Sequence, residues 1–441
     1  MSQTITEQSP PADEPVAQRD GSGSLALLLA AVGALVVVSV VLDFWKTLAV
    51  VAALFAMIML HELGHFVMAR RGGMKVTEFF VGMGPRIWSV RKGEVEYGVK
   101  ALPIGGYVKI IGMNNLDEVP AADEPRAYRQ KGFAARLGVA VAGSTTHMLI
   151  AIALLFSLNA FVGNPAHAVV DPIVSSISRL ETGQSPAEQA GLRLGDRIVG
   201  LDGTAMSDWD AIRAYVAARP GTPIRVDVVR AGQPTSLTIT PVDLSTVRPA
   251  ADPKDPNAGV DRPAPAPGAT GFIGIGATLR NPTVNPVSAV GRSVTDLGSL
   301  VKGTVSSLGR LVTFQGIKSY KDQLVGNPVA KGDQGTRFLS PVGLVRVAGQ
   351  QADDGMASVL ILLTLINVFV GLFNMIPLLP FDGGHVTVAV YEEIRTRLQG
   401  GRRYMADVAK LLPLAYVTVA ALVFIGLSSL YLDIARPLQL Q

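Results

Sequence analysis

The chain has 441 residues, of which 49% are hydrophobic and 17% are charged, and its mean hydropathy is positive at +0.35. This composition excludes an ordinary soluble enzyme and is typical of a membrane protein with room for more than one domain. The 39 basic and 35 acidic residues are too evenly balanced for nucleic-acid binding. Because the chain contains no cysteine, a bound metal needs His, Asp or Glu ligands.

A polar N-terminal stretch precedes five apolar segments. Residues 1–23 are predicted to be a disordered cytoplasmic tail. Since about 20 apolar residues span a bilayer, we expect transmembrane helices at 24–42, 48–71, 136–162, 357–384 and 411–432. A cleaved signal peptide is the alternative for 24–42. Acidic residues precede that segment and its apolar run is long, so a retained helix is favoured.

Basic residues gather in two short connections, one between the second and third segments and one between the fourth and fifth. The positive-inside rule predicts that both connections are cytoplasmic. The N-terminus is then cytoplasmic, whereas residues 163–356 and the C-terminus lie outside the cell. We therefore expect a multi-pass protein of the cell membrane with a large extracytoplasmic insertion.

Residues 72–130 alternate between apolar and polar side chains and contain glycine breaks, which predicts strands. One interpretation is a sheet that lies against the functional site and offers an open edge. A simple cytoplasmic hairpin is the alternative on this pattern alone.

The extracytoplasmic insertion begins with a small folded module at 169–243. It resembles a PDZ domain, and the resemblance rests on a Gly-Leu, a Gly-Asp and an Asp-Gly pair around one predicted strand, at Gly191-Leu192, Gly195-Asp196 and Asp202-Gly203. The resemblance implies a groove that binds a peptide by strand addition. Residues 244–270 are expected to be a Pro/Ala-rich linker, and 271–356 a helical region that packs outside the cell or lies on the membrane surface.

The second apolar segment contains the sequence HELGH. Each ionisable residue at the centre of a membrane helix costs at least about 2.5–3.5 kcal/mol, so their presence points to a function. His61 and His65 are four positions apart and share a helix face, where both imidazoles reach one metal ion. Glu62 stands beside them, as a general base for hydrolysis requires. Chance occurrence of this spacing is the alternative, and it is improbable in a chain with five histidines.

A zinc site of this kind needs a third protein ligand and keeps a fourth position for water. Asp382 is the strongest candidate because it ends the fourth apolar segment at the same predicted membrane depth as His65. Pro377 and Pro380 break the helix before it, which is tolerated in a membrane where the backbone is buried in protein or lines a cavity. The alternative is that Asp382 is only a turn residue before Gly383. The presence of HELGH in the same chain disfavours this alternative.

These residues together resemble a known family. The chain is similar to the site-2 proteases, which are intramembrane zinc metalloproteases of peptidase family M50, and most closely to the regulator-of-sigma-E-protease type with one PDZ domain. The resemblance covers roughly residues 48–432 and rests on HELGH, on Asn-x-x-Pro-x-x-Pro-x-Asp-Gly at 374–383, and on GMGP and LPIGGYVKI within the strand-rich region. It implies one Zn²⁺ held by His61, His65 and Asp382, Glu62 as general base, and Asn374 as a substrate contact.

The same resemblance implies the fold and the partners. The fold is a multi-pass α-helical membrane protein with a re-entrant β-region on the cytoplasmic side and an inserted extracytoplasmic PDZ domain. The substrates are single-pass transmembrane proteins such as an anti-sigma factor, cut in regulated intramembrane proteolysis. The PDZ domain either filters substrates by size or receives a peptide or new C-terminus.

Two features depart from the family. An Asn is commonly found four residues after the glycine at Gly143, where this chain has His147. His147 is then a fourth metal contact, an oxyanion-stabilising donor or a hydrogen-bonded structural residue. The helix at 24–42 is additional to the usual four. His385 is a candidate to contact and orient the metal ligands, and no functional role is expected for His167.

Two rival functions belong to other classes. A proteolytically inactive PDZ scaffold has no use for a buried metal site. A metal transporter is expected to carry polar residues along a path through several helices, whereas here they converge at one depth. We therefore expect an intramembrane zinc endopeptidase.

Overall fold

The computed structural model describes residues 21–113, 117–246, 270–311, 313–326 and 338–435. The chain divides into two compact units. The first combines Met1–Leu155 with Val294–Leu438, and the second comprises Phe156–Ser293. Most of the predicted tail (1–23) and linker (244–270) lies outside the described residues, so both stay predictions.

Four helices among the described residues are long and apolar enough to cross a membrane. They are α2 (Trp45–Arg71), α3 (Phe133–Ser157) with its continuation η3 (Leu158–Val162), α9 (Met356–Phe373), and α11 (Leu412–Ala435) with the preceding turn η6 (Val408–Leu411). The fourth predicted helix, 357–384, is interrupted. It ends at Phe373, and α10 (Asp382–Leu398) begins after a loop containing Pro377 and Pro380, which cannot continue a helix.

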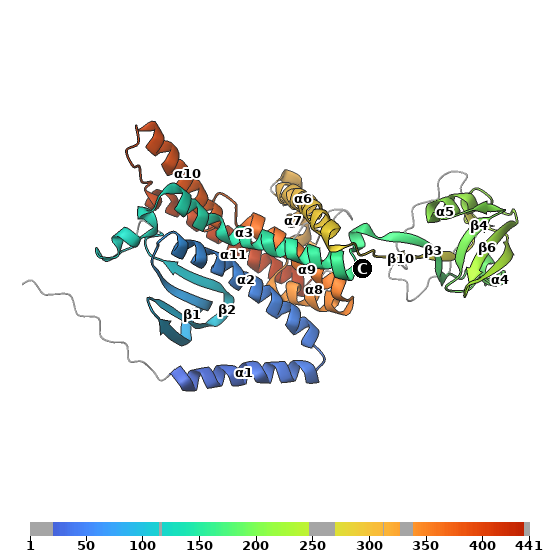
Figure 1. The fold of residues 1–441 in the computed structure, drawn as a ribbon, viewed down its shortest axis with the longest axis horizontal. Helices are drawn as coiled ribbons and strands as arrows, with labels where there is room; N and C mark the ends of the chain where they lie inside the picture. Colours follow the sequence, from blue (N-terminus) through green and yellow to red (C-terminus); the bar gives the residue numbers. More distant parts are fainter. Residues whose placement is uncertain (1–20, 114–116, 247–269, 312, 327–337, 436–441) are drawn as a thin grey trace, which may run out of the picture. The chain divides into compact units, whose positions relative to one another are not determined.

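The N-terminal apolar helix is α1 (Gly21–Val41), and its stretch Leu25–Val41 is shorter than the four spans. It contacts α2 and the first strand, β1 (Val76–Lys92), and Figure 1 shows it set apart from α2 over most of its length. Nearly all of its described side chains are exposed, and Ser39 is the buried one among them. An exposed apolar surface suits contact with lipid, but a transmembrane position for 24–42 stays a prediction.

The strands expected within 72–130 are present. β1 and β2 (Val95–Ile110) are antiparallel and lie beside α2 (Figure 1). Both strands bend back, so that Phe79 pairs with Tyr97 on one side and with Val108 on the other. Gly82 permits this bend, since its φ is +83° and a Cβ there would lie 2.5 Å from the Leu102 carbonyl oxygen. Residues 106–110, which pair with 76–81, form what we call the edge segment.

Further helices complete the first unit, and one of them, α6, begins in the second unit. Ser340 caps α8 (Pro341–Asp353), and its backbone N–H donates to Asp433 of α11 over 2.7 Å. The hydroxyls of Tyr320 and Ser428 are 2.7 Å apart and join α7 to α11. Two single turns precede α3. The remaining bounds are α6 (Pro286–Leu311), α7 (Phe314–Val325), η1 (Glu124–Arg126) and η2 (Tyr128–Gln130).

The second unit contains a sheet of order β10-β3-β4-β6-β7, with β5 paired to β4. Its core is aliphatic and includes Val174, Ile198, Ile212 and Val226. The predicted module at 169–243 therefore extends further than expected, because β10 pairs with β3 and the helical region starts only at Pro286. The elements are β3 (Val169–Ile177), α4 (Pro186–Gln189), β4 (Arg197–Leu201), β5 (Thr204–Ala205), α5 (Trp209–Ala217), β6 (Ile224–Arg230), β7 (Gln233–Ile239), β8 (Val242–Asp243), β9 (Gly271–Phe272) and β10 (Ile275–Arg280).

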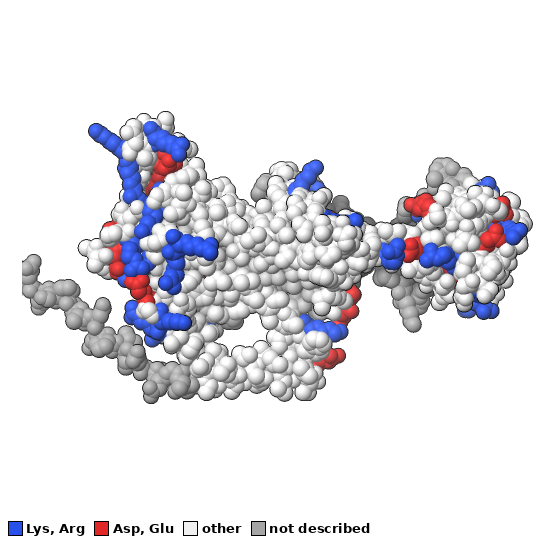
Figure 2. Space-filling view, viewed as in Figure 1, with Lys and Arg blue, Asp and Glu red and all other residues white. Residues whose placement is uncertain are grey.

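Charged side chains of the first unit are unevenly distributed. Figure 2 shows Lys and Arg gathered where α10, the two strands β1 and β2 and the segment before α3 lie, whereas the surface over the apolar helices is uncharged. Arg126, Arg397 and Arg403 are exposed members of this basic end. An uncharged surface, as seen on this face, is what lipid contact requires. The orientation of the chain across the membrane stays a prediction.

Candidate metal centre

The three predicted metal ligands meet in the first unit. His61 and His65 lie on one face of α2, one turn apart, and Asp382 is the first residue of α10. The two Nε2 atoms are 3.1 Å apart, and Asp382 Oδ2 lies 3.4 Å from Nε2 of His61 and 3.3 Å from Nε2 of His65. Among the described residues, this is the one group of His, Asp and Glu side chains placed to hold a metal.

The donor atoms fit a tetrahedral metal. Ligand atoms about 2.0–2.1 Å from a tetrahedral zinc ion lie about 3.3 Å from one another, which is the spacing observed. Asp382 Oδ2 is buried and has no hydrogen-bond donor among the described residues, as expected of an atom reserved for a cation. His65 Nδ1 lies 2.8 Å from the Val139 carbonyl, to which it donates, so its Nε2 is the nitrogen left to bind a metal.

A glycine of α3 makes room for this centre. A Cβ on Gly143 would lie 2.3 Å from a His61 ring atom and 2.5 Å from His65 Nε2. On the opposing helix, a Cβ on Gly64 would lie 2.5 Å from Thr146 Oγ1. Small residues on both helices thus let α2 and α3 approach closely where the ligands sit.

Glu62 lies between the ligands and the β-region. A Cβ on Gly106 would lie 2.5 Å from Glu62 Cγ, so the start of the edge segment packs directly against this side chain. Gly105 precedes it with a φ of +84°, a conformation that glycine adopts at no steric cost. The sequence therefore places a strand edge beside the predicted general base.

The loop between α9 and α10 positions Asp382. Its two ends are joined by a hydrogen bond of 2.8 Å from the Gly383 N–H to the Asn374 carbonyl. A Cβ on Gly383 would lie 2.3 Å from the Met375 carbonyl oxygen, so only glycine fits there. Asn374, the predicted substrate contact, follows the last residue of α9 and begins the loop that leads to Asp382.

The other histidines are not part of the group of ligands. His147 donates from Nδ1 to Asn367 Oδ1 over 2.8 Å, because the Asn367 amide nitrogen itself donates to the Leu363 carbonyl. The ring centroids of His147 and His61 are 5.0 Å apart. This geometry matches the hydrogen-bonded alternative for His147. His385 lies in the first turn of α10, and His167 is in a short turn of the second unit, η4 (Pro165–His167).

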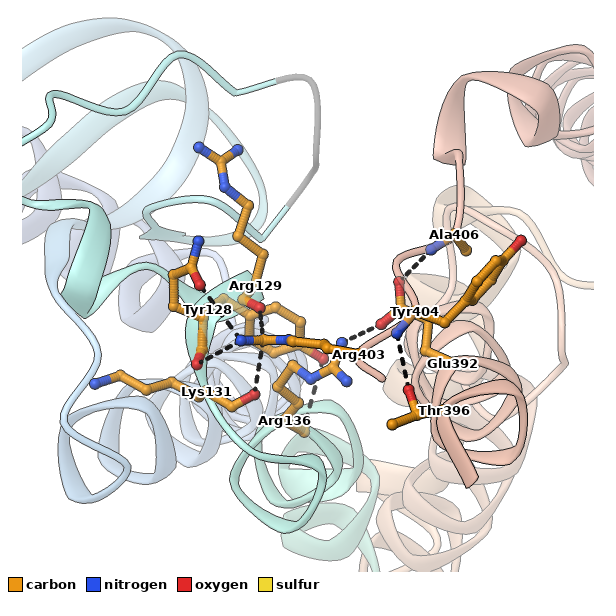
Figure 3. A network of polar contacts seen from close by, with 10 residues as sticks. Tyr128, Arg129, Lys131, Arg136, Glu392, Thr396, Arg403, Tyr404 and Ala406 are labelled. Carbon is orange, nitrogen blue, oxygen red and sulfur yellow. Dashed lines mark hydrogen bonds and ion pairs between the residues drawn. The ribbon is translucent and has the colours of Figure 1, made fainter. Parts of the chain in front are cut away.

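A buried ion pair anchors α10, and sequence reasoning missed it. Arg136 lies in the first turn of α3 and donates to Glu392 of α10 (Figure 3). Glu392 also accepts from the Ala406 N–H over 2.7 Å. The Tyr128 hydroxyl donates to the Arg136 carbonyl over 3.2 Å, and burial raises the pKa of Tyr128 to about 12, which keeps this donor protonated at neutral pH.

Arg403 makes a second connection between the same segments. Its guanidinium donates to the carbonyls of Arg129, Gln130 and Lys131, just before α3 (Figure 3). The Tyr404 N–H donates to the Thr396 hydroxyl over 3.0 Å and closes the turn after α10. Both ends of α10 are therefore fixed, the first by the loop around Asp382 and the last by this network.

Comparison with known proteins agrees with this geometry. A model of peptidase family M50 matches residues 49–415. The zinc metalloprotease Rip1 of Mycolicibacterium smegmatis is 33% identical over 414 residues, covering 88% of this chain and 97% of the relative. Rip1 of Mycobacterium tuberculosis is also 33% identical and covers 88% and 96%. A putative zinc metalloprotease of Rhizobium meliloti is 30% identical over 360 residues, covering 78% and 86%.

The family match spans all three donor residues, the glutamate beside them, nearly all of α2, the whole of α3 and α9, and the first residues of α11. The chain therefore belongs to peptidase family M50, the site-2 protease family that its motifs predicted, and is a membrane metalloprotease.

Proposed function

We propose that this enzyme is an intramembrane zinc endopeptidase that cuts the transmembrane segment of other membrane proteins. The observation that carries the proposal is the donor triangle of His61, His65 and Asp382, built on helices that are apolar enough to cross a membrane. Zinc is the metal of this enzyme, since the spacing suits a tetrahedral ion with two imidazoles and a carboxylate. The similar proteins are named as zinc metalloproteases, which agrees with zinc.

The chain's own residues supply the remaining chemistry. When bound, zinc lowers the pKa of a water molecule toward about 7 and polarises the scissile carbonyl. We assign Glu62 as the general base that takes the proton of the attacking water and returns it to the leaving amine nitrogen. Val139 keeps His65 in the tautomer that leaves Nε2 free, through the hydrogen bond to its carbonyl.

Substrate binding is assigned to the edge segment and to Asn374. The peptide bonds of a membrane helix are hydrogen-bonded within the helix, so the substrate must unwind before it is cut. An extended substrate added to the edge segment regains those hydrogen bonds from β2. Asn374 lies in the loop of Asp382, from which its amide reaches the substrate backbone beside the metal.

The second unit is assigned as a PDZ domain that recognises substrates. It contains a groove of about 190 Å³ between α5 and the stretch from Gly271 to Ala277, lined by Trp209, Ile212, Val216 and Ile273 among others. A groove between a helix and a strand suits an added peptide strand, such as a new C-terminus. We further propose that the physiological substrate is a single-pass anti-sigma factor, trimmed outside the cell before the cut.

The test is cleavage of a trimmed single-pass anti-sigma-type substrate in membranes by wild type, Glu62→Gln and Asp382→Asn, with the zinc content of each measured. We expect wild type to cut, Glu62→Gln to retain zinc and lose at least about 10³-fold in rate, and Asp382→Asn to lose zinc. If Glu62→Gln cuts at the wild-type rate, its assignment as general base is wrong. If wild type takes up no zinc when zinc is supplied, yet binds the substrate and leaves it whole, a PDZ scaffold replaces the protease assignment.

A further inference from the structure

A cavity of about 390 Å³ lies within the first unit, and its lining includes Pro380 and His385, which flank Asp382 in the sequence. One wall is the edge segment from Tyr107 to Ile110, and the opposite wall is α10, through His385, Val388 and Glu392. The cavity is therefore bounded by the two elements that also carry the centre, because β2 touches Glu62 and α10 begins with Asp382.

The edge segment leads from the general base into this cavity. Gly106 packs against Glu62, and the four following residues line the cavity. Among the described residues, this stretch pairs with β1 on one side only. Its other side is closed just beyond Ile110, where the Tyr128 N–H donates to the Ile111 carbonyl over 2.9 Å. The backbone of 107–110 is thus open toward the cavity and offers hydrogen bonds to an extended peptide.

A buried donor in the cavity wall lacks a partner. Arg136 lines the cavity and its side chain is only 10% exposed. One guanidinium nitrogen donates to Glu392, but Nε has no acceptor among the described residues. A buried donor without an acceptor costs about 1–3 kcal/mol, which a ligand that supplies an acceptor recovers. An extended peptide presents such an acceptor, a backbone carbonyl, at every residue.

We propose that this cavity binds the substrate residues on the N-terminal side of the scissile bond, as a strand antiparallel to the edge segment, with Arg136 Nε donating to one of their carbonyls. The direction follows from the sheet, in which every pair is antiparallel. The edge segment runs from Gly106, which packs against Glu62, to Ile110. An antiparallel substrate strand therefore runs from Ile110 toward Gly106. Its scissile bond then lies beside Glu62, and the substrate residues before that bond lie alongside 107–110. The inference rests on the proposed endopeptidase function and adds a specificity site to it.

The absence of cysteine in the chain makes a cross-linking test direct. Val388→Cys, which faces the cavity, is combined with Glu62→Gln to leave the substrate whole, and single cysteines are scanned through the substrate around its cut site. We expect disulfides at alternate substrate positions on the N-terminal side, because the side chains of a strand alternate. Val390→Cys, on the same helix but exposed and outside the cavity, is the matched control and should form none.

Two activity measurements accompany the cross-linking. Val388→Trp fills the cavity and should lower kcat/KM about tenfold with unchanged zinc content, whereas Val390→Trp should stay within about twofold of wild type. Arg136→Lys keeps a cation beside Glu392 but removes the Nε donor, and it should raise KM with zinc retained. A purely structural Arg136 predicts unchanged cross-linking in Arg136→Lys.

The outcomes separate this inference from the function on which it rests. If wild type cuts the substrate but Val388→Cys cross-links no better than Val390→Cys, or only on the C-terminal side, the cavity assignment is overturned and the protease assignment stands. If zinc-loaded wild type cuts no transmembrane segment, the proposed function fails and this inference fails with it.

Discussion

At the scale of single residues, the candidate metal centre combines side chains that are placed to hold an ion with a glycine that makes space for them. The grouping of His61, His65 and Asp382 could be predicted from the sequence motifs, whereas the role of Glu62 as general base stays a prediction. Gly143 could not be assigned a role, because its importance arises where α3 passes over two imidazoles of another helix. A weak signal exists in the sequence, since glycine inside a helix costs about 1 kcal/mol relative to alanine and is retained for a reason.

Replacing that glycine should empty the metal site. A Cβ at position 143 would overlap the rings of His61 and His65, so Gly143→Ala should lose zinc and reduce cleavage at least about 100-fold, although alanine favours the helix. The measurement is zinc content per protein together with the cleavage rate. Gly138→Ala is the control on the same helix, because its Cβ would meet only the flexible end of Met68, at 3.1 Å. A zinc-loaded, active Gly143→Ala would contradict the described packing.

At the scale of elements, the position of α10 depends on contacts that sequence patterns do not reveal. Arg136 and Glu392 are 256 positions apart and pair only once α3 and α10 are packed together. The break between α9 and α10 was predictable, because two prolines precede Asp382. The pairing of Phe79 with two strand segments could not be predicted, since the alternation of apolar and polar residues identifies strands but does not specify their partners.

Removing the charge of Glu392 should destabilise the first unit strongly. Glu392 is 2% exposed, and Glu392→Gln leaves Arg136 as a buried charge without a counter-ion, at a cost of about 3 kcal/mol. Its neighbour Glu393 pairs with the exposed Arg397, so Glu393→Gln should cost at most about 0.5 kcal/mol. Thermal unfolding of both variants in detergent measures the difference. Equal unfolding temperatures would show that the buried pair does not anchor α10.

The second unit should show a pH-dependent stability of its own. Asp196 accepts hydrogen bonds from Arg230, which lowers the pKa of its carboxyl below the usual range. Because the pKa of Asp196 is lower in the folded state, this stabilisation is complete at a pH above the unfolded-state pKa of about 3.9. It is lost as the pH falls through the folded-state pKa. Asp196→Asn should therefore cost about 2 kcal/mol at pH 7 and progressively less below about pH 4.

Denaturant unfolding followed by Trp209 fluorescence, with Trp45 and Trp88 replaced by Phe, reports on this unit. Asp210→Asn is the control, because the Asp210 side chain is 81% exposed and should change stability by less than about 0.5 kcal/mol at every pH. A cost of Asp196→Asn that does not vary between pH 7 and pH 3 would exclude the assigned ion pair as its source.

At the scale of the whole molecule, the general plan of the chain was predictable. The long apolar helices, the strand-rich region after α2 and a folded module between α3 and α9 all follow from periodicity and composition. The C-terminal boundary of that module could not be predicted, because β10 pairs with β3 across a segment whose composition is typical of a linker. Pairing between strands so far apart in the chain depends on the folded sheet and leaves little local trace.

The most direct test of the central claim is the position of the cut. A single-pass substrate is incubated with zinc-loaded wild type in lipid bilayers, and the masses of both products locate the broken bond, with Glu62→Gln as the control for other proteases. The account predicts one cut within the apolar transmembrane segment, made by wild type and absent with Glu62→Gln. A cut confined to the water-exposed part of the substrate, or one that Glu62→Gln makes equally well, would contradict it.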